Sequence, residues 1–313
     1  MAAIGKGYAK VILFGEHFVL YGLPGVAAGI DKYVQVEAQK VKDSDDVLFD
    51  DKVFNEKISL KENPEHIKCK IFHAMFDSDE YLPKKGIKFI INSNFPAGVG
   101  LGYSGALSVA MARAMNTLFD QGWKDDKINE LAYISECVNH ATPSGIDNTC
   151  SSYGTTIWCE KNMIGGKNTA RPVKCGKSLY FVLVESSVKH STAEATEFIQ
   201  KLKEKNPKDF DIICADYKSI VSKVKKEIQF GGTEEIGKLM NKNNELLKQL
   251  GVSTPEIDQI VRISNFEGAF GAKLTGSGMG GRVLVLCEND KHQDKIIASL
   301  VGKGFKAIKI KVN

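Results

Sequence analysis

A glycine-rich stretch, PAGVGLGYSG at residues 96–105, contains residue types that can bind a phosphate group. Gly98, Gly100 and Gly102 lack side chains, so their backbone N–H groups can converge on a concave anion site. The helix expected from Ser104 would add its positive end, and the Ser104 hydroxyl is suited to hold Mg²⁺ from the first turn. The spacing alone leaves two readings open, a phosphate-binding loop and a structural glycine turn.

Two other glycine patterns match nucleotide-binding spacings but fail on context. GTEEIGKL (232–239) has Walker A spacing, yet Leu239 stands where a hydroxyl must reach Mg²⁺, and the segment lies in an amphipathic pattern. GSGMGG (276–281) has the dinucleotide spacing, but strand-like RVLVLC follows it instead of a helix. We therefore expect a helix at the first pattern and a turn between two strands at the second.

Hydrophobic periodicity predicts the elements that must position these loops. Apolar or alternating runs predict strands at 8–14, 33–41, 86–92, 153–159, 179–185, 271–275, 282–287 and 306–312. Amphipathic runs predict helices at 104–119, 125–140, 193–206, 210–228, 234–251, 254–268 and 291–302. Polar residues, or Pro and Gly, predict loops at 42–52 and at TPSGIDN (142–148).

The order of these elements favours the α+β class, because neighbouring strands are not uniformly connected by helices. A chain of 313 residues is long enough for about two domains. We place the boundary in the stretch 160–177, which is rich in Gly, Asn and Lys, and so expect domains at 1–170 and 171–313.

Composition excludes several protein classes. Hydrophobic residues make up 43% and charged residues 26%, as in ordinary globular proteins and unlike disordered or collagenous chains. A net charge of +4 does not indicate nucleic-acid binding, and no apolar run is long enough to span a membrane. MAAIGKGYAK lacks a signal-peptide core, and the seven scattered cysteines form no C-x-x-C pair. We therefore expect reduced thiols, no zinc site and a cytoplasmic protein.

Three segments, in order along the chain, resemble the signature motifs of the GHMP small-molecule kinases. They are KVILFGEHFVLYGLPGVAAGID (10–31), PAGVGLGYSGALSVA (96–110) and KLTGSGMGG (273–281). Within that superfamily, GEHFVLYG (15–22) and TPSGIDN (142–148) are similar to the mevalonate kinase branch. The resemblance implies a two-domain α+β fold. Its N-terminal domain would be like ribosomal protein S5 domain 2, and its C-terminal domain would be ferredoxin-like.

The resemblance also implies the reaction, which is MgATP-dependent phosphorylation of the 5-hydroxyl of mevalonate. Asp147 would accept or orient the proton of the attacking hydroxyl. Lys10 would keep that carboxylate ionised and steady the γ-phosphate. Without the resemblance, an Asx turn at Asp147 and a strand-edge lysine at Lys10 are the alternatives.

Ligand-binding roles follow in the same way. Ser104 and Glu136 would hold Mg²⁺, although a helical Glu is ordinarily solvent-facing. Glu16 and His17 would contact mevalonate; a turn-capping Glu and a packed His are the alternatives. The further implied contacts are Ser144, Gly145 and Thr192 with mevalonate, and Pro96, Gly98, Gly100, Leu101, Gly102, Tyr103, Ser104, Gly105, Gly276, Gly278 and Gly280 with ATP.

The sequence departs from the family pattern at several positions. Tyr103 and Gly105 flank Ser104 where the family usually has Ser and Ala, and His190 stands where many members have Arg. Arg grips a carboxylate bidentately and His does not, which leaves Lys189 as the alternative cation. Met279 and Arg282 are larger than the usual residues of the third motif. These departures concern the substrate more than the nucleotide.

Two other functions stay open. One is a sister kinase that phosphorylates the 3-hydroxyl of mevalonate or a galactose- or homoserine-type alcohol. The other is a ligand sensor without turnover, which the presence of Asp147, Lys10, Ser104 and Glu136 disfavours. No nucleic-acid or membrane partner is expected, and the sequence does not separate a monomer from a homodimer.

Overall fold

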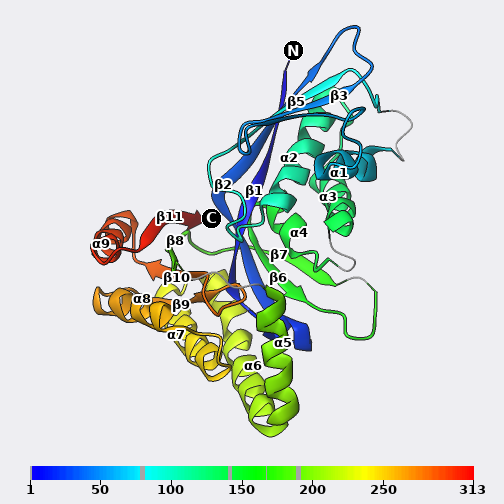
Figure 1. Cartoon of the computed structure of the whole chain (residues 1–313). Helices are drawn as coiled ribbons and strands as arrows, with labels where there is room; N and C mark the ends of the chain where they lie inside the picture. The colour runs from blue at the N-terminus through cyan, green and yellow to red at the C-terminus, as the bar shows by residue number, and fades with distance from the viewer. Residues whose placement is uncertain (1, 78–81, 140–142, 167, 188–191) are drawn as a thin grey trace. The chain divides into compact units, whose positions relative to one another are not determined.

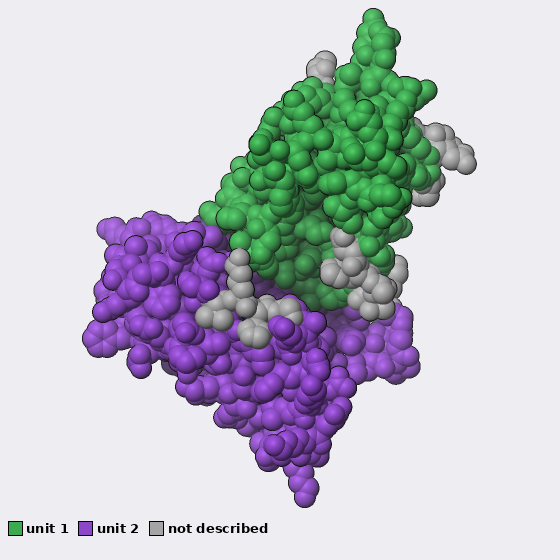
Figure 2. Space-filling model, viewed as in Figure 1, with its two compact units in different colours: residues 1–10, 29–154 green, residues 11–28, 155–313 purple. Residues whose placement is uncertain are grey.

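The computed structural model describes residues 2–77, 82–139, 143–166, 168–187 and 192–313 (Figure 1). Backbone contacts divide the chain into two compact units, shown in green and purple in Figure 2. Unit 1 comprises residues 1–10 and 29–154, and unit 2 comprises residues 11–28 and 155–313. Each unit therefore contains part of the N-terminal segment. The domain boundary expected at residue 170 stays a prediction.

The larger sheet formed by the described residues has seven strands, in the order β4-β3-β5-β2-β6-β7, with β1 paired to β2. Their bounds are β1 (Ala3–Phe14), β2 (Gly25–Lys40), β3 (Val47–Asp51), β4 (Glu56–Ser59), β5 (Ile87–Ser93), β6 (Thr156–Glu160) and β7 (Thr169–Val173). Val34, Val36 and Ala38 are fully buried on one face of β2. This alternation is the pattern that predicted a strand at 33–41.

The loop expected at 42–52 is confirmed for residues 42–46 but wrong for residues 47–51, because β3 lies there as an inner strand between β4 and β5. Val47 and Phe49 are buried, and Phe49 stands opposite Phe89 in the parallel register with β5. The acidic residues were misleading, since Asp51 is itself buried and lies 2.9 Å from Lys68 Nζ. The sequence analysis also missed β4, β7 and helix α1 (Ile67–Phe76).

Helices α2 (Tyr103–Leu118), α3 (Asp125–Asn139) and α4 (Ile146–Tyr153) pack together in unit 1. The first two confirm the predicted helices at 104–119 and 125–140. Strand β1 lies very close to α2, because a Cβ on Gly5 or Gly7 would come 2.0 Å from the carbonyl oxygen of Ala110 or Ala106. These two glycines therefore allow the strand that leads to Lys10 to lie against α2.

The loop predicted at TPSGIDN is wrong for its last three residues, because α4 begins at Ile146. Residue 142 lies outside the described residues. Gly145 is the N-cap of this helix and has a left-handed φ of 77°. Glycine accepts this conformation without a steric cost, so the chain can turn directly into the helix.

The smaller sheet is antiparallel and has the order β11-β8-β10-β9. Its strands β8 (Leu179–Glu185), β9 (Gly271–Thr275), β10 (Arg282–Cys287) and β11 (Lys306–Val312) match the predicted ranges residue for residue. Helix α9 (Asp290–Val301) connects β10 to β11, and α5–α8 connect β8 to β9. If the four strands are numbered along the chain from β8, their order across the sheet is 4-1-3-2. Along the chain, strands and helices follow one another as β-α-β-β-α-β. Both features confirm the expected ferredoxin-like arrangement.

The helices that connect β8 to β9 agree with the amphipathic pattern. They are α5 (Thr192–Lys205), α6 (Pro207–Phe230), α7 (Thr233–Gln249) and α8 (Pro255–Phe266). GTEEIGKL lies almost wholly in α7, and GSGMGG connects β9 to β10, so both context arguments are confirmed. Thr254 caps α8 by accepting the Ile257 N–H, ahead of Pro255 at the first helical position.

Residues 11–28 are anchored to α6 within unit 2. The rings of Phe18, in the short helix η1 (Phe18–Tyr21), and Tyr217 stack with centroids 3.9 Å apart. The Tyr217 hydroxyl donates to the Pro24 carbonyl at 2.7 Å. An aromatic pair of this kind contributes about 0.5–1.5 kcal/mol beyond its area burial. The seven cysteines are free thiols, and no helix in the described part of the chain combines the length and apolarity needed to cross a membrane.

Candidate functional site

Lys10 and Asp147 form an ion pair within unit 1, with Lys10 Nζ 3.0 Å from Asp147 Oδ1. The Lys10 side chain is 12% exposed and that of Asp147 is 32% exposed, so the carboxylate keeps an open side. Burial alone would lower the pKa of Lys10, but the Asp147 and Glu136 carboxylates raise it above its usual value. Lys10 is therefore an ammonium at pH 7, and it donates to a partly exposed carboxylate.

The start of α4 fixes the position of Asp147. The Ser144 hydroxyl accepts the Ile146 N–H at 3.3 Å, and the Thr149 hydroxyl donates to the Gly145 carbonyl at 2.6 Å. Asp147 lies in the first turn, where the helix dipole favours a carboxylate. Ser144 and Gly145 thus shape the turn that presents Asp147, and their contact with a substrate stays a prediction.

The glycine loop, residues 96–102, has alternating left-handed backbone. Gly98, Gly100 and Gly102 have φ angles of 72°, 69° and 73°. Alternation of this kind turns successive N–H groups toward one concave side. Gly102 caps α2 without a side chain, so no capping side chain bonds to the N–H groups of the first turn, which can instead bind an anionic ligand. Leu101 is buried, Pro96 is exposed, and the Lys10 N–H donates to the Leu101 carbonyl at 2.9 Å.

Two glycines bring this loop to the ion pair. A Cβ on Gly102 would lie 2.9 Å from Lys10 Cγ. A Cβ on Gly105 would lie 3.0 Å from the carbonyl carbon of Asp147 and 3.2 Å from its Cβ. Gly105, where the family usually has Ala, is thus explained by the close approach of α2 to α4. The structure therefore joins Lys10, Asp147 and the glycine loop, which are far apart in the sequence.

Two serine hydroxyls connect the backbone of Ser104 to the residue before Glu136. The Ser108 hydroxyl donates to the Ser104 carbonyl at 3.1 Å and also bonds to the hydroxyl of Ser135, the residue before Glu136. Glu136 is 5% exposed. A hydroxyl and a carboxylate are the hard oxygen donors that Mg²⁺ accepts. No group of three or more acidic, His or Cys residues in the described part of the chain is placed to hold a metal.

Tyr103 sits beside the glycine loop within an aromatic cluster. Its ring packs edge-on against Phe54 and Phe95, with centroids 5.8 Å and 6.1 Å away. Burial, together with the carboxylates of Asp51 and Glu56, raises the pKa of the Tyr103 hydroxyl well above its usual value. These contacts explain how a large side chain is accommodated next to Ser104.

A second group of charged residues is enclosed in unit 2. Glu16 and Lys273 have fully buried side chains, and Lys273 Nζ lies 2.5 Å from Glu16 Oε1. Lys273 also donates to the Leu274 carbonyl at 2.5 Å. Burial raises the pKa of Glu16 and lowers that of Lys273, while their mutual attraction opposes both shifts. Glu16 is thus engaged by a lysine, and its contact with a substrate stays a prediction.

Lys273 lies in the third motif, but its sequence pattern alone does not identify it as a site residue. A signal was present, because a lysine in the apolar strand GAKLT must find a counter-charge when it is buried. The sequence did not say which carboxylate this would be, since the partner lies 257 residues away.

His17 joins the first motif to the glycine turn at 276–281. Its Nε2–H donates to the Ser277 carbonyl at 2.7 Å, and its backbone has a left-handed φ of 62°. Burial lowers the pKa of His17, and the bond to Ser277 partly opposes that shift. The ring is therefore neutral at pH 7 with Nε2 protonated, which leaves Nδ1 as an acceptor.

We expect His17 to make unit 2 acid-sensitive. Because its pKa is lower in the folded state than the ordinary value of 6.5, the unfolded state binds the proton first as the pH falls. His17 therefore contributes its full stabilisation of the folded state above about pH 6.5, and this contribution is lost as the pH falls from there to the lowered pKa of the folded state. His17→Gln should therefore flatten the fall in the free energy of unfolding between about pH 7.5 and about pH 5.5, measured by urea denaturation. His73→Gln, which removes a half-exposed imidazole beside Asp77 on α1, is the comparison, and an unchanged slope in His17→Gln would contradict this reasoning.

The glycine turn at 276–281 packs against the backbone of Val252. Gly276, Gly278 and Gly280 have positive φ angles of 95°, 76° and 130°. The Met279 N–H donates to the Val252 carbonyl at 2.6 Å, and a Cβ on Gly278 would lie 2.5 Å from that same oxygen. The turn is therefore held against the Val252 backbone, and its contact with ATP stays a prediction.

Four further residues complete the sequence-based list. Arg282 pairs with Glu185 across the sheet at 3.6 Å, which explains its size. Thr192 is the exposed first residue of α5. Lys189 and His190 lie outside the described residues.

Comparison with known proteins agrees with this geometry. The GHMP kinases N terminal domain matches residues 66–155, and the GHMP kinases C terminal domain matches residues 223–307. The mevalonate kinase of Pyrococcus furiosus is 32% identical, over 94% of this chain and 91% of that protein. That of Methanocaldococcus jannaschii is 30% identical, over 91% of this chain and 92% of that protein.

Solved structures give the same result. A crystal structure of L. major mevalonate kinase in complex with R-mevalonate superposes with a TM-score of 0.87 at 30% identity, covering 99% of this chain and 95% of that one. The Methanococcus jannaschii mevalonate kinase superposes with a TM-score of 0.86 at 28% identity, covering 100% and 99%. The two-domain GHMP kinase fold expected from the motifs is confirmed. The chain belongs to the mevalonate kinase family of the GHMP kinases.

Proposed function

We propose that this chain transfers the γ-phosphoryl group of MgATP to the 5-hydroxyl of mevalonate, giving 5-phosphomevalonate and ADP in isoprenoid precursor synthesis. The observation that carries the proposal is the Lys10–Asp147 pair, 3.0 Å apart, held against the glycine loop of unit 1. It occurs in a chain 32% identical to a mevalonate kinase over 91% of that protein.

Asp147 and Lys10 act on the attacking hydroxyl. Asp147 accepts the hydroxyl proton on a carboxylate oxygen that Lys10 does not cover. Lys10 donates to Asp147 and to the oxygens between which the phosphoryl group moves. Phosphoryl transfer needs little covalent help from the protein, so the main task of the pair is to position the hydroxyl and stabilise charge.

The glycine loop and α2 hold the nucleotide. Backbone N–H groups at Gly98, Gly100 and Gly102 and in the first turn of α2 bind the phosphates of ATP. Ser104 and Glu136 would hold Mg²⁺, which when bound neutralises negative charge on the β- and γ-phosphates. In unit 2, the glycines of the 276–281 turn, Gly276, Gly278 and Gly280, are assigned to the nucleotide as well.

The assigned mevalonate contacts are Glu16, His17, Ser144, Gly145 and Thr192. Neutral His17 offers Nδ1 as an acceptor for a substrate hydroxyl. Glu16 also pairs with Lys273, which fixes its position next to His17. We further propose a cytoplasmic location and leave the homodimer to a measurement of mass in solution.

Coupled ADP release by the purified protein with MgATP and mevalonate tests the function. We expect ADP release that depends on mevalonate and, by NMR, a product phosphorylated at the 5-hydroxyl. A 3-phosphate would keep the chemistry and reassign the substrate pocket. Turnover with galactose or homoserine alone would favour a sister kinase. ATP binding without ADP release from any of these alcohols would favour a sensor and contradict the proposal.

A further inference from the structure

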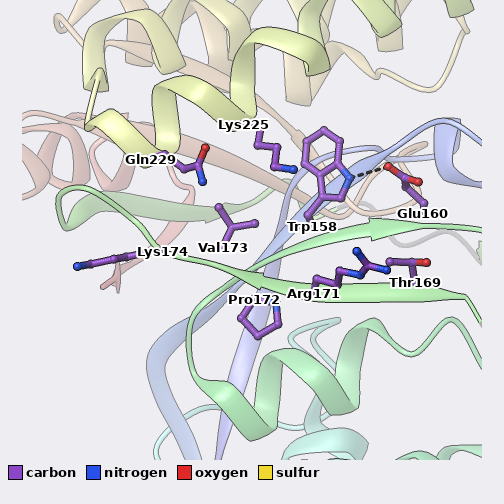
Figure 3. A pocket seen from close by; sticks show the side chains of 9 residues that line it. All are labelled: Trp158, Glu160, Thr169, Arg171, Pro172, Val173, Lys174, Lys225 and Gln229. Carbon is purple, nitrogen blue, oxygen red and sulfur yellow. Dashed lines mark hydrogen bonds between the residues drawn. The ribbon is translucent and has the colours of Figure 1, made fainter.

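A pocket of about 390 Å³ lies in unit 2, between the β6–β7 hairpin and α6 (Figure 3). This size is within the range of roughly 300–1,000 Å³ that is usual for small-ligand sites. The side chains that give it its chemistry are Trp158, Glu160, Arg171, Lys174, Lys225 and Gln229. None of them belongs to the proposed kinase site.

The pocket is lined by three cations and a single carboxylate. Arg171 comes from β7, Lys174 follows that strand, and Lys225 comes from α6. Among the residues that the structure describes, neither Arg171 nor Lys174 has a carboxylate within ion-pair distance. Glu160 accepts the indole N–H of Trp158 at 2.7 Å. The lining is therefore positive overall and attracts an anion.

Trp158 gives the pocket an apolar wall between two of these cations. Arg171 stands directly opposite Trp158 in the β6–β7 register, so the two side chains share one face of the hairpin. Lys225 Nζ lies 5.1 Å from the centroid of the indole ring. Figure 3 shows Lys225 reaching toward Trp158 from α6, and Arg171 lying beneath it on β7. A ligand here would meet cationic donors and a flat aromatic surface together.

The two walls of the pocket are fixed to each other. The Gly176 N–H donates to the Ile228 carbonyl at 2.9 Å, and a Cβ on Gly176 would lie 2.4 Å from the Gln229 carbonyl oxygen. The chain leaving β7 is therefore held tightly to the last turn of α6. A site whose walls are already in place loses less entropy when it binds a ligand.

The end of α6 does not cancel the positive charge. A helix C-terminus carries partial negative charge on its last carbonyl groups, which disfavours an anion. Here the Ile228 carbonyl accepts from Gly176, and the Glu227 carbonyl accepts from Gly231 and Gly232. These bonds reduce the partial charge, so the full charges of Arg171, Lys174 and Lys225 dominate.

The exposed edge of β7 is unsuited to pairing with another strand. β7 ends the strand order of the larger sheet, and Pro172, its fourth residue, has no N–H to donate. A proline on an edge strand blocks strand addition. The chemistry of the pocket therefore suits a small ligand and not an added peptide strand.

We propose that this pocket binds a small organic phosphate. Its phosphate group lies between Arg171 and Lys225, with the planar guanidinium binding two oxygens, and Lys174 at the far end of the pocket adds positive charge. Its organic part lies against the Trp158 ring. The site is separate from the proposed kinase reaction and does not depend on it.

Fluorescence of Trp158 tests the proposal directly. The chain has two tryptophans, so Trp123→Phe leaves Trp158 as the sole indole reporter. In this variant we expect phenyl phosphate to change the Trp158 emission in a saturable way, and to bind more tightly than inorganic phosphate. Arg171→Gln and Lys225→Gln should each weaken binding about tenfold or more, as expected when a charge-assisted phosphate contact is lost.

Lys226→Gln is the matched control, because it removes the same charge from an exposed neighbouring position on α6 that does not line the pocket. It should bind phenyl phosphate almost as tightly as the Trp123→Phe parent. The kcat and KM of Arg171→Gln and Lys225→Gln should be unchanged without added phosphate. No saturable change in the folded Trp123→Phe protein would overturn the proposal. So would equal weakening by Lys226→Gln, undiminished binding in the Arg171→Gln/Lys225→Gln double variant, or equal affinity for the two probes.

Discussion

Replacing Asp147 with Asn should lower kcat by about 10²- to 10⁴-fold while ATP binding persists, because an amide cannot accept the hydroxyl proton. Asn keeps the size of the side chain, so the close contact with Gly105 is retained. Lys10→Met should have a comparable effect on kcat, since it removes the ammonium 3.0 Å from Asp147. Steady-state ADP release, together with nucleotide titration of each variant, measures both quantities.

Asp120→Asn is the control, because Asp120 is exposed and has a left-handed backbone that Asn accepts equally well. It should leave kcat and KM unchanged. Full turnover in both Asp147→Asn and Lys10→Met would remove the proposed mechanism. Loss of ATP binding in Asp147→Asn would assign this residue to the nucleotide site instead of to the hydroxyl.

Replacing Lys273 with Met should cost about 3–5 kcal/mol of folding free energy, because it leaves the Glu16 carboxylate buried without its counter-charge. Both side chains of this pair are fully buried. The Glu16→Gln/Lys273→Met double variant should recover most of the loss, since it removes both charges. Urea denaturation of the two single variants and the double variant gives the coupling energy directly.

Acid pH should reduce the cost of Lys273→Met. Burial raises the pKa of Glu16, and losing Lys273 raises it further, so a lower pH protonates the orphaned carboxyl and relieves the penalty. Lys295→Met, which breaks the more exposed pair with Glu267, should cost below about 1 kcal/mol and serves as the control. A loss in Lys273→Met as small as that control would contradict the assigned pair.

The strands of the smaller sheet were predicted well, because each one is an apolar or alternating run. RVLVLC in β10 and LYFVLVE in β8 are uninterrupted apolar runs, and both ranges are confirmed residue for residue. β3 and β7 were missed because charges or a proline interrupt them. Asp51 is buried in β3 against Lys68, and β7 at the sheet edge needs backbone bonds on one side alone, which permits Pro172.

The candidate site was predictable where a local motif carries it. Asp147, Lys10 and Ser104 lie in short segments with recognisable spacing, and the structure brings Lys10 and Asp147 together. The Glu16–Lys273 pair has no local signature, because it joins residues 257 positions apart. Sequence periodicity reports which face of an element is buried, but it does not report which buried charge meets which.

The division of unit 2 between residues 11–28 and 155–313 has a consequence for biosynthesis. The Pro24 carbonyl cannot accept its hydrogen bond until Tyr217, 193 positions later, has been synthesised, and Glu16 cannot pair until Lys273 has been synthesised. The apolar segment around Phe14 and Phe18 therefore leaves the ribosome well before the helices and strands that cover it have been made. Contacts this distant close slowly and leave hydrophobic chain exposed in the meantime. Release of the nascent chain before β9 is complete should therefore yield a polypeptide that depends on chaperones.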